Sequence, residues 1–285
     1  AKGVLAWTRV ASHRPVRRRT PRPQLDDLAA LQLTSGTTGV PKAAMLTHRN
    51  LRSNAAQSAA WVPDLVPGRE VFYAVLPLFH AYGLTLSLTT ALTLGARIVL
   101  FPTFDVTLTL DAMRRTPPTF LAAVPPIYDA LARAAVRAGI DLSSLRNAIS
   151  GAMALPPSTV LRWEEATHGI IVEGYGMTES SPISVGNPMG PLRRPGTVGV
   201  PFPSTEIRVV DPADPTRDVA DGAEGELLVR GPQVFQGYWN RPEDTASTLL
   251  AGGWLRTGDI VTVDAEGFVT VVDRLKELII SGGFN

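Results

Sequence analysis

The sequence predicts an α/β fold in which helices cover a mostly parallel sheet, followed by a small antiparallel subdomain resembling a β-barrel. Between residues 71 and 173, short apolar runs alternate with helical segments of ten or more residues. After Pro195-Gly196 the composition changes, and short strands alternate with turns. Helices between strands typically connect parallel strands, whereas strands joined by turns pair antiparallel.

In the first part, capping residues, prolines and apolar runs predict the elements. Thr47 can cap a helix from about His48 to Trp61, which Pro63 ends. Short apolar runs bounded by Gly or Pro indicate buried strands. We expect strands at 71–76, 98–100, 120–124, 147–150 and 170–173. We expect helices at 84–94, 105–116, 125–138 and 157–166.

In the second part, the expected strands are shorter and lie between turns. They occupy 206–210 and 226–229, followed by a hairpin of 260–263 with 268–272. The sequence Asp264-Ala265-Glu266-Gly267 supplies the turn of that hairpin.

Charge and cysteine content limit the classes of function. The 285 residues contain 27 Lys and Arg against 26 Asp and Glu, so the net charge of +1 gives no support for a nucleic-acid partner. With no cysteine there is no disulfide and no thiol catalysis, which fits a reducing cytoplasm. No signal peptide is readable at the N-terminus. We therefore expect a cytoplasmic protein.

An apolar stretch from Tyr82 to Phe101 raises the question of a membrane span. Thr and Ser are scattered through it, and Gly95-Ala96-Arg97 interrupts it, so a buried helix is the better interpretation. A helix that is apolar on nearly every side belongs in a core or along an apolar ligand tunnel. Both interpretations remain open.

The first 27 residues are basic and rich in proline, a mixture that resists both helix and sheet. We interpret residues 1–27 as a poorly structured linker. The alternative is a surface that makes peripheral contact with anionic membrane lipid. The arginines concerned are Arg9, Arg14, Arg17, Arg18, Arg19 and Arg22.

A loop rich in hydroxyls and glycine, LTSGTTGVPK at residues 33–42, has the composition of a polyphosphate cradle. Glycines let backbone N–H groups approach an anion, and a lysine supplies a point charge. A Walker-type P-loop needs Gly before the lysine and Ser or Thr after it, but Pro41 and Ala43 flank Lys42 here. The magnesium ligand must therefore come from elsewhere. A plain surface turn is the alternative.

Two further motifs are expected where parallel strands end, the usual place for ligands in such sheets. Gly151-Ala152 would let a flat ring lie against backbone, and Tyr175 offers an aromatic face. Glu179 supplies the carboxylate oxygen that Mg²⁺ prefers. The plainer interpretation of Glu179 is an ordinary loop carboxylate.

Six motifs occur in order across almost the whole chain. They are TSGTTGVPK (34–42), LPLFHAYG (76–83), SGAM (150–153), EGYGMTES (173–180), WLRTGDI (254–260) and DRLKELIISGGFN (273–285). Together they resemble the adenylate-forming enzymes, the superfamily of acyl-CoA synthetases, luciferases and nonribosomal adenylation domains. Within that superfamily they are most similar to long-chain fatty acyl-CoA synthetases.

The resemblance implies which residues bind ATP, the acyl group and the metal. The implied ATP-binding residues are Thr34, Ser35, Gly36, Thr37, Thr38, Gly39, Lys42, Gly151, Ala152, Glu173, Gly174, Tyr175, Gly176, Met177, Thr178, Asp259 and Arg274. The implied catalytic residues are Lys42, His80, Thr178 and Glu179, with Glu179 as the metal ligand. The implied acyl-binding residues are His80, Tyr82, Gly83 and Gly174, and Lys276 falls at the hinge position of the family.

The resemblance also implies a two-step reaction with ATP, Mg²⁺ and coenzyme A as cofactors. A fatty acid carboxylate attacks ATP to give acyl-AMP and pyrophosphate, and a thiol then displaces AMP. The alternatives are an aryl or coumaroyl-type CoA ligase, an acyl-AMP ligase that serves a carrier protein, and a catalytically incomplete nucleotide-binding module. An amino-acid-activating domain is disfavoured, because no acidic partner for an ammonium lies in residues 79–82.

Four segments are expected along the chain. Residues 1–27 are the linker, 28–195 the core that binds ATP and the acyl group, 196–273 the barrel-like subdomain, and 274–285 a hinge. The family continues into a C-terminal domain, and a further segment precedes this one, so we expect a fragment that makes little acyl-CoA alone. Ala43 stands where the family usually has Gly, which puts the backbone geometry beside Lys42 in question.

Overall fold

A seven-stranded sheet forms the centre of the computed structural model, which describes residues 22–34 and 41–274. The strand order is β4-β3-β5-β6-β7-β8-β9. Its strands are β3 (Val71–Ala74), β4 (Arg97–Leu100), β5 (Phe120–Ala123), β6 (Asn147–Ser150), β7 (Ile170–Gly176), β8 (Ile183–Gly186) and β9 (Val200–Pro201). The first five strands in chain order pair in parallel, and β8 and β9 extend the sheet antiparallel. The predicted fold class is confirmed, whereas β8 and β9 were not expected from the sequence.

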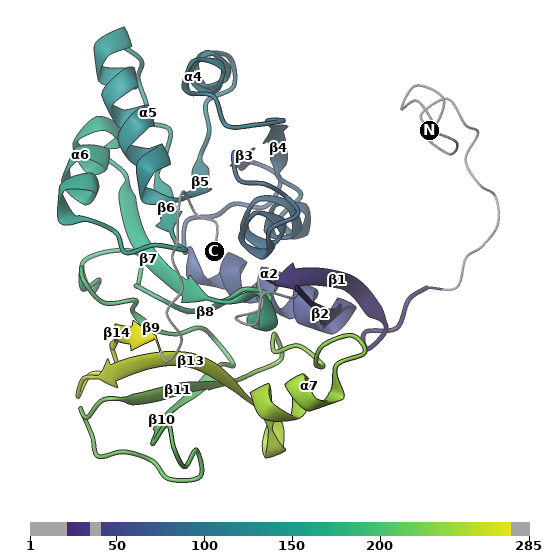
Figure 1. Ribbon diagram of the computed structural model, residues 1–285. Coiled ribbons are helices and arrows are strands. Elements are labelled where there is room, and N and C mark those ends of the chain that lie inside the picture. The colour runs from purple at the N-terminus through teal and green to yellow at the C-terminus, as the bar shows by residue number, and fades with distance from the viewer. Residues whose placement is uncertain (1–21, 35–40, 275–285) are drawn as a thin grey trace.

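Helices cover both faces of this sheet (Figure 1). Those of the first part are α2 (His48–Trp61), α3 (Thr90–Thr93), α4 (Val106–Arg115), α5 (Pro125–Ala138) and α6 (Pro157–Thr167). Strand β5 shows how the faces divide. Phe120 and Ala122 pack into a core with Leu86 and Ala91, whereas Leu121 and Ala123 pack into a core with residues of α4, α5 and α6. Successive side chains of a strand point to opposite faces, so a continuous apolar run is buried on both faces of the sheet.

The expected helix at 84–94 is two helices of different geometry. A π-helix, η1 (Gly83–Thr89), precedes the single turn α3. Position 83 has no room for a side chain, because a Cβ there would lie 2.4 Å from the carbonyl oxygen of Pro77. Among the described residues, no helix is long and apolar enough to cross a membrane.

A second, five-stranded antiparallel sheet follows. It contains β10 (Glu206–Val210), β11 (Gly225–Arg230), β12 (Leu249–Leu250), β13 (Trp254–Val263) and β14 (Val269–Arg274). Three short elements are η2 (Thr178–Ser180), which follows β7, and α7 (Pro242–Thr248) and η3 (Ala251–Gly253), which flank β12. The predicted hairpin turn at 264–267 is present, since the N–H of Asp264 donates to the carbonyl of Phe268 at 3.0 Å.

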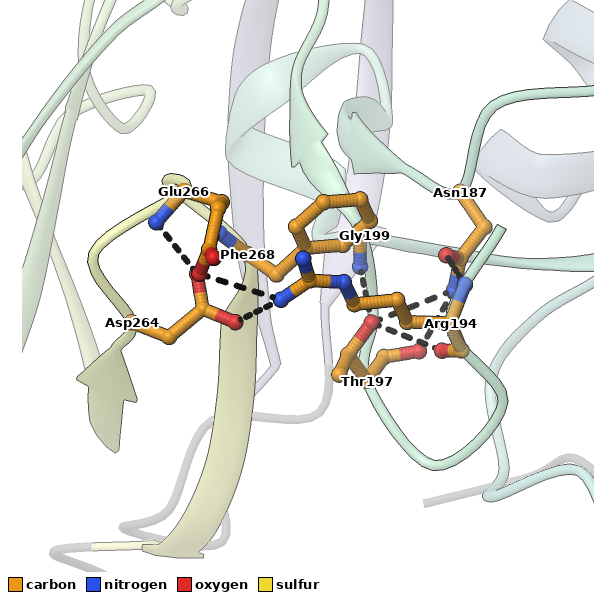
Figure 2. A network of polar contacts seen from close by, with 7 residues as sticks. All are labelled: Asn187, Arg194, Thr197, Gly199, Asp264, Glu266 and Phe268. Carbon is orange, nitrogen blue, oxygen red and sulfur yellow. Dashed lines mark hydrogen bonds and ion pairs between the residues drawn. The ribbon is translucent and has the colours of Figure 1, made fainter. Parts of the chain in front are cut away.

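The loop between β8 and β9, residues 187–199, is attached to this hairpin by polar contacts (Figure 2). Arg194 pairs with Asp264 and Glu266, and its guanidinium lies 4.3 Å from the ring centroid of Phe268. The backbone N–H of Arg194 donates to the side chain of Asn187 at 2.8 Å. Backbone bonds of Val198 and Gly199 with Val269 continue the attachment. The loop thereby fixes where β14 lies against the main sheet.

Strands β1 (Leu28–Thr34) and β2 (Lys42–Thr47) pair antiparallel on either side of the glycine-rich loop, and neither was expected as a strand. Thr34 and Lys42 are register partners, so they join the two ends of the loop. Ala44 and Leu46 pack in a core with Leu227, Val229 and other residues of the antiparallel sheet. The hairpin therefore packs with the second sheet although it precedes the first in sequence.

Helix α2 begins as predicted. Thr47 accepts a hydrogen bond from the N–H of Asn50 at 3.1 Å, and Asn50 Oδ1 accepts from the N–H of Thr47 at 2.9 Å. This reciprocal cap fixes the start of the helix directly after β2.

We predict that Thr47→Ala lowers the free energy of unfolding by about 1 kcal/mol, because the buried N–H of Asn50 loses its acceptor. Thr47→Ser keeps the oxygen and should lose much less. Urea denaturation of both variants measures the difference, and equal losses would contradict a capping role.

Candidate active site

Lys42 and Glu179 come from motifs far apart in sequence, and Tyr238 joins them. The hydroxyl of Tyr238 donates to Glu179 Oε1 at 2.6 Å. Lys42 Nζ lies 5.2 Å from the centroid of the Tyr238 ring, and it forms an ion pair with Asp244. Two residues implied as catalytic thus share one cluster. Tyr238 and Asp244 were not singled out from the sequence.

Backbone pairing places Tyr238 there. Ala44 of β2 and Tyr238 form an antiparallel bridge. The N–H of Met45 donates to Gly237 O at 2.9 Å, and the N–H of Trp239 donates to Ala43 O at 2.8 Å. Residues 236–239 therefore extend the β1–β2 pair, and the side chain of Tyr238 reaches the end of β7. Local sequence carries no signal for such long-range pairing.

Glu179 lies in η2, just after β7, and only 5% of it is exposed. Burial raises the pKa of its carboxyl group, while the Tyr238 hydroxyl and the charge of Lys42 act in the opposite direction. Burial also raises the pKa of Tyr238, and the neighbouring carboxylate adds to that effect. The Tyr238 hydroxyl thus holds one of the two carboxylate oxygens in place.

These residues fit magnesium that arrives with phosphates. Among the described residues, no group of three or more His, Cys, Asp or Glu could hold a metal ion. Mg²⁺ usually keeps several waters and binds through one or two carboxylates plus substrate phosphates. A single carboxylate beside a lysine suits that mode, with Thr178 at the start of the same turn.

Tyr175 and Asp259, both implied in nucleotide binding, also contact each other. The hydroxyl of Tyr175 donates to Asp259 Oδ2. Both residues are buried, and Asp259 is the register partner of Arg274 on β14. The N–H of Asp259 donates to Thr257 Oγ1 at 3.1 Å, which fixes the turn that precedes it. The two sheets therefore meet at these residues.

Glu173 accepts hydrogen bonds from two loops at the carboxyl ends of the strands of the main sheet. Its two oxygens accept from the N–H groups of Leu155 and Gly196, each at 3.2 Å. Burial raises the pKa of this carboxyl group, and both hydrogen bonds oppose that rise. Glu173 thus connects the segment after β6 to the loop between β8 and β9.

Gly151, Gly174 and Tyr82 come from three motifs and lie together. A Cβ at Gly151 would be 3.2 Å from Tyr82 Cζ and 3.3 Å from Gly174 O. The Tyr82 hydroxyl donates to Ile149 O at 2.5 Å, and burial raises the pKa of Tyr82. Tyr82 therefore packs against Gly151, one of the residues that the resemblance implies in ATP binding.

Other glycine positions are tightly packed. A Cβ at Gly174 would lie 2.9 Å from Ile183 Cδ1, and one at Gly176 would lie 1.8 Å from Pro182 O.

Ala152 is exposed and has φ of 65°, a left-handed conformation that costs a non-glycine residue energy. Met177 donates its N–H to Pro182 O at 3.0 Å.

His80 begins the segment that leads into η1. Its Nδ1 accepts from the N–H of Tyr82 at 3.2 Å, which places the ring proton of the neutral form on Nε2. Burial lowers the pKa of His80. A neutral imidazole with a donor at Nε2 can hydrogen-bond a carboxylate.

Some implied site residues lie outside the described part of the chain. These are Ser35, Gly36, Thr37, Thr38, Gly39 and Lys276.

An α/β sheet with its motifs at the carboxyl ends of the strands has the architecture of an enzyme that binds a nucleotide or a small substrate there. A family model described as AMP-binding enzyme matches residues 2–239. The chain therefore belongs to the AMP-binding enzyme family, and the resemblance to adenylate-forming enzymes is confirmed.

Named relatives in this family include two CoA-dependent enzymes. A long-chain-fatty-acid–CoA ligase of Bacillus subtilis (strain 168) is 42% identical over 267 residues, which are 92% of this chain and 47% of the relative. A feruloyl-CoA synthase of Amycolatopsis sp is 40% identical over 263 residues, covering 92% of this chain and 52% of the relative. The chain spans about half the length of the curated relatives that it matches.

Solved structures agree with the fold. An anthranilate CoA ligase, AuaEII, in complex with anthranoyl-AMP matches with a TM-score of 0.86 and 29% identity, over 100% of this chain and 54% of that one. ATP-bound MatB from Rhodopseudomonas palustris matches with a TM-score of 0.80 and 36% identity, over 92% of this chain and 51% of that one.

We predict that His80 titrates below its ordinary pKa of about 6.5. The folded state then binds fewer protons than the unfolded state, so the contribution of His80 to stability is complete above pH of about 6.5. It is lost as pH falls through the folded-state pKa. NMR titration of the imidazole checks the direction, and His80→Gln should reduce the loss of stability on acidification. His168→Gln, which changes an exposed histidine, should leave that loss in place.

We predict that Tyr238→Phe lowers the free energy of unfolding at pH 8 by about 1–2 kcal/mol, because the buried carboxylate of Glu179 loses a donor. Tyr73→Phe is the matched control, since its hydroxyl donates at 2.7 Å to a neutral acceptor, Thr116 O. Urea denaturation should show the smaller loss for Tyr73→Phe. The reverse order would argue against a charged acceptor at position 179.

Proposed function

We propose that this chain is the ATP- and acyl-binding part of a fatty acyl-CoA ligase. It would activate a fatty acid carboxylate to acyl-AMP with release of pyrophosphate, and the acyl group would then pass to coenzyme A. The observation that carries the proposal is the cluster of Lys42, Tyr238 and Glu179. Glu179 follows β7, and Tyr175 of that strand donates its hydroxyl to Asp259.

Repulsion between two anions is the difficulty that this site would solve. A carboxylate oxygen forms a bond to the α-phosphorus while the bond to the bridging oxygen of pyrophosphate breaks. Lys42 would neutralise charge on the phosphates, and Glu179 with Thr178 would orient them through Mg²⁺, which supplies Lewis-acid stabilisation when bound. His80 would hold the substrate carboxylate through its Nε2 proton. In the second step the thiol sulfur attacks the acyl carbonyl and AMP leaves.

The surroundings of Gly174 support an apolar acid. The side chains of Ile183 and Ile149 lie closest to the position that a Cβ of Gly174 would occupy, and Tyr82 is buried nearby. Apolar walls suit an aliphatic chain, because each CH₂ transferred from water contributes about 0.8 kcal/mol.

An aryl-CoA ligase is the second candidate. It is favoured by the 40% identity to a feruloyl-CoA synthase and by the fold shared with an anthranilate CoA ligase. Aromatic acids would use the same apolar walls but a shorter pocket.

Pyrophosphate exchange with the 285-residue chain and a panel of acids tests the proposal. We predict exchange with C12 to C18 fatty acids. Exchange confined to cinnamates would favour the aryl candidate, and exchange with no acid would favour a nucleotide-binding module without catalysis. Lys42→Met should reduce exchange by about 100-fold, as expected for loss of one charge-stabilising group. Arg137→Met removes an exposed cation from α5 and should not change it.

A further inference from the structure

We propose that Asp244 is a positioning residue that holds Lys42 as its internal counter-ion until the β- and γ-phosphates of a nucleotide displace it. The inference rests on the proposed function and extends it, because Asp244 belongs to none of the motifs that carry the family resemblance. Its effect would be selective: it weakens binding of a nucleotide triphosphate and leaves binding of AMP unchanged.

The ion pair lies at the start of α7. Asp244 is in the first turn of this helix, after Pro242, and its Oδ1 pairs with Lys42 Nζ. The two side chains are 17% exposed for Lys42 and 31% for Asp244. Such partial burial reduces screening by solvent, so the pair competes effectively with an incoming anion.

The backbone builds this pair into the fold. Thr245 Oγ1 accepts from the N–H of Tyr238 at 2.9 Å, and a Cβ at Gly237 would lie 2.5 Å from Thr245 Cγ2. Because residues 236–239 also pair with β2, the first turn of α7 is fixed against the strand that begins with Lys42. The distance between the two charges is therefore set by tertiary structure.

A lysine carries one compact charge and three donors, and two acidic groups already share it here. Asp244 forms an ion pair with Lys42, and the positive charge of Lys42 also acts on the Glu179 carboxylate. A polyphosphate that approaches Lys42 must replace Asp244 as its partner. AMP has no β- or γ-phosphate, so its binding leaves the pair intact. When pyrophosphate departs, Asp244 is in position to bind the lysine again.

The test compares equilibrium binding of ATP and AMP, each with Mg²⁺, to the 285-residue chain by isothermal titration calorimetry. We expect Asp244→Asn to tighten ATP binding by about three- to tenfold, the range of a partly buried ion pair, with no change for AMP. Glu243→Gln is the matched control, because it removes the same charge from the same helical turn and its side chain is exposed. In a Lys42→Gln background, Asp244→Asn should have no effect on ATP binding.

The outcomes separate the two proposals. If the unaltered chain binds no ATP, the proposed function fails and this inference fails with it. If it binds ATP but Asp244→Asn matches Glu243→Gln, or weakens ATP binding, only the inference is overturned. Asp244→Ala should tighten ATP binding as Asp244→Asn does, and a change in AMP binding by a variant whose urea denaturation is unaltered also overturns the inference.

Discussion

The structure depends on the pairing of residues 236–239 with β2. Three backbone hydrogen bonds connect the two segments, from Met45 to Gly237, Gln236 to Met45 and Trp239 to Ala43. They attach the antiparallel half of the chain to the hairpin that carries the glycine-rich loop. The same pairing places the ring of Tyr238 between Lys42 and Glu179. This pairing therefore allows one tyrosine to contact both the lysine and the carboxylate.

A buried carboxylate is costly unless its charge is compensated, and Glu179 shows how the fold meets that cost. One oxygen accepts from Tyr238, the backbone carbonyl accepts from the N–H of Phe235 at 2.9 Å, and Lys42 supplies positive charge. Burial still raises the carboxyl pKa. A cation that arrives with phosphates would add to the compensation that these groups provide.

Much of the main sheet could be predicted because its signals are local. Apolar runs, the Thr47 cap and the prolines at the starts of α5 and α6 act within a few residues, so β6 and helix α2 have the predicted bounds, as does β10 of the second sheet. The strands β1 and β2 could not be predicted in this way. The leucines of β1, Leu28, Leu31 and Leu33, are exposed, so the strand has no buried apolar run that would predict it.

In the candidate site, too, the residues with local sequence signals could be predicted and the tertiary contacts could not. Motif residues such as Tyr175 and Asp259 could be assigned one by one, and their mutual hydrogen bond could not. Tyr238 and Asp244 carried no signal, because their roles come from tertiary contact with Lys42 and Glu179. The π-helix geometry of η1 was also hidden, since an apolar run does not distinguish it from an α-helix.

The glycines of EGYGMTES illustrate why a motif can be recognised before its physical reason is known. Glycine in such a loop is usually explained by close approach of a ligand to the backbone. Gly176 has a different constraint, because a Cβ there would collide with Pro182 O, an atom of the same sheet end. A Cβ at Gly174 would meet only side-chain carbon atoms of Ile183 and Ile149. Packing against backbone therefore requires glycine at 176, whereas at 174 the neighbouring side chains would have to shift. The exposed, left-handed Ala152 has no such packing reason, so its conformation is better explained by the shape of the loop after β6.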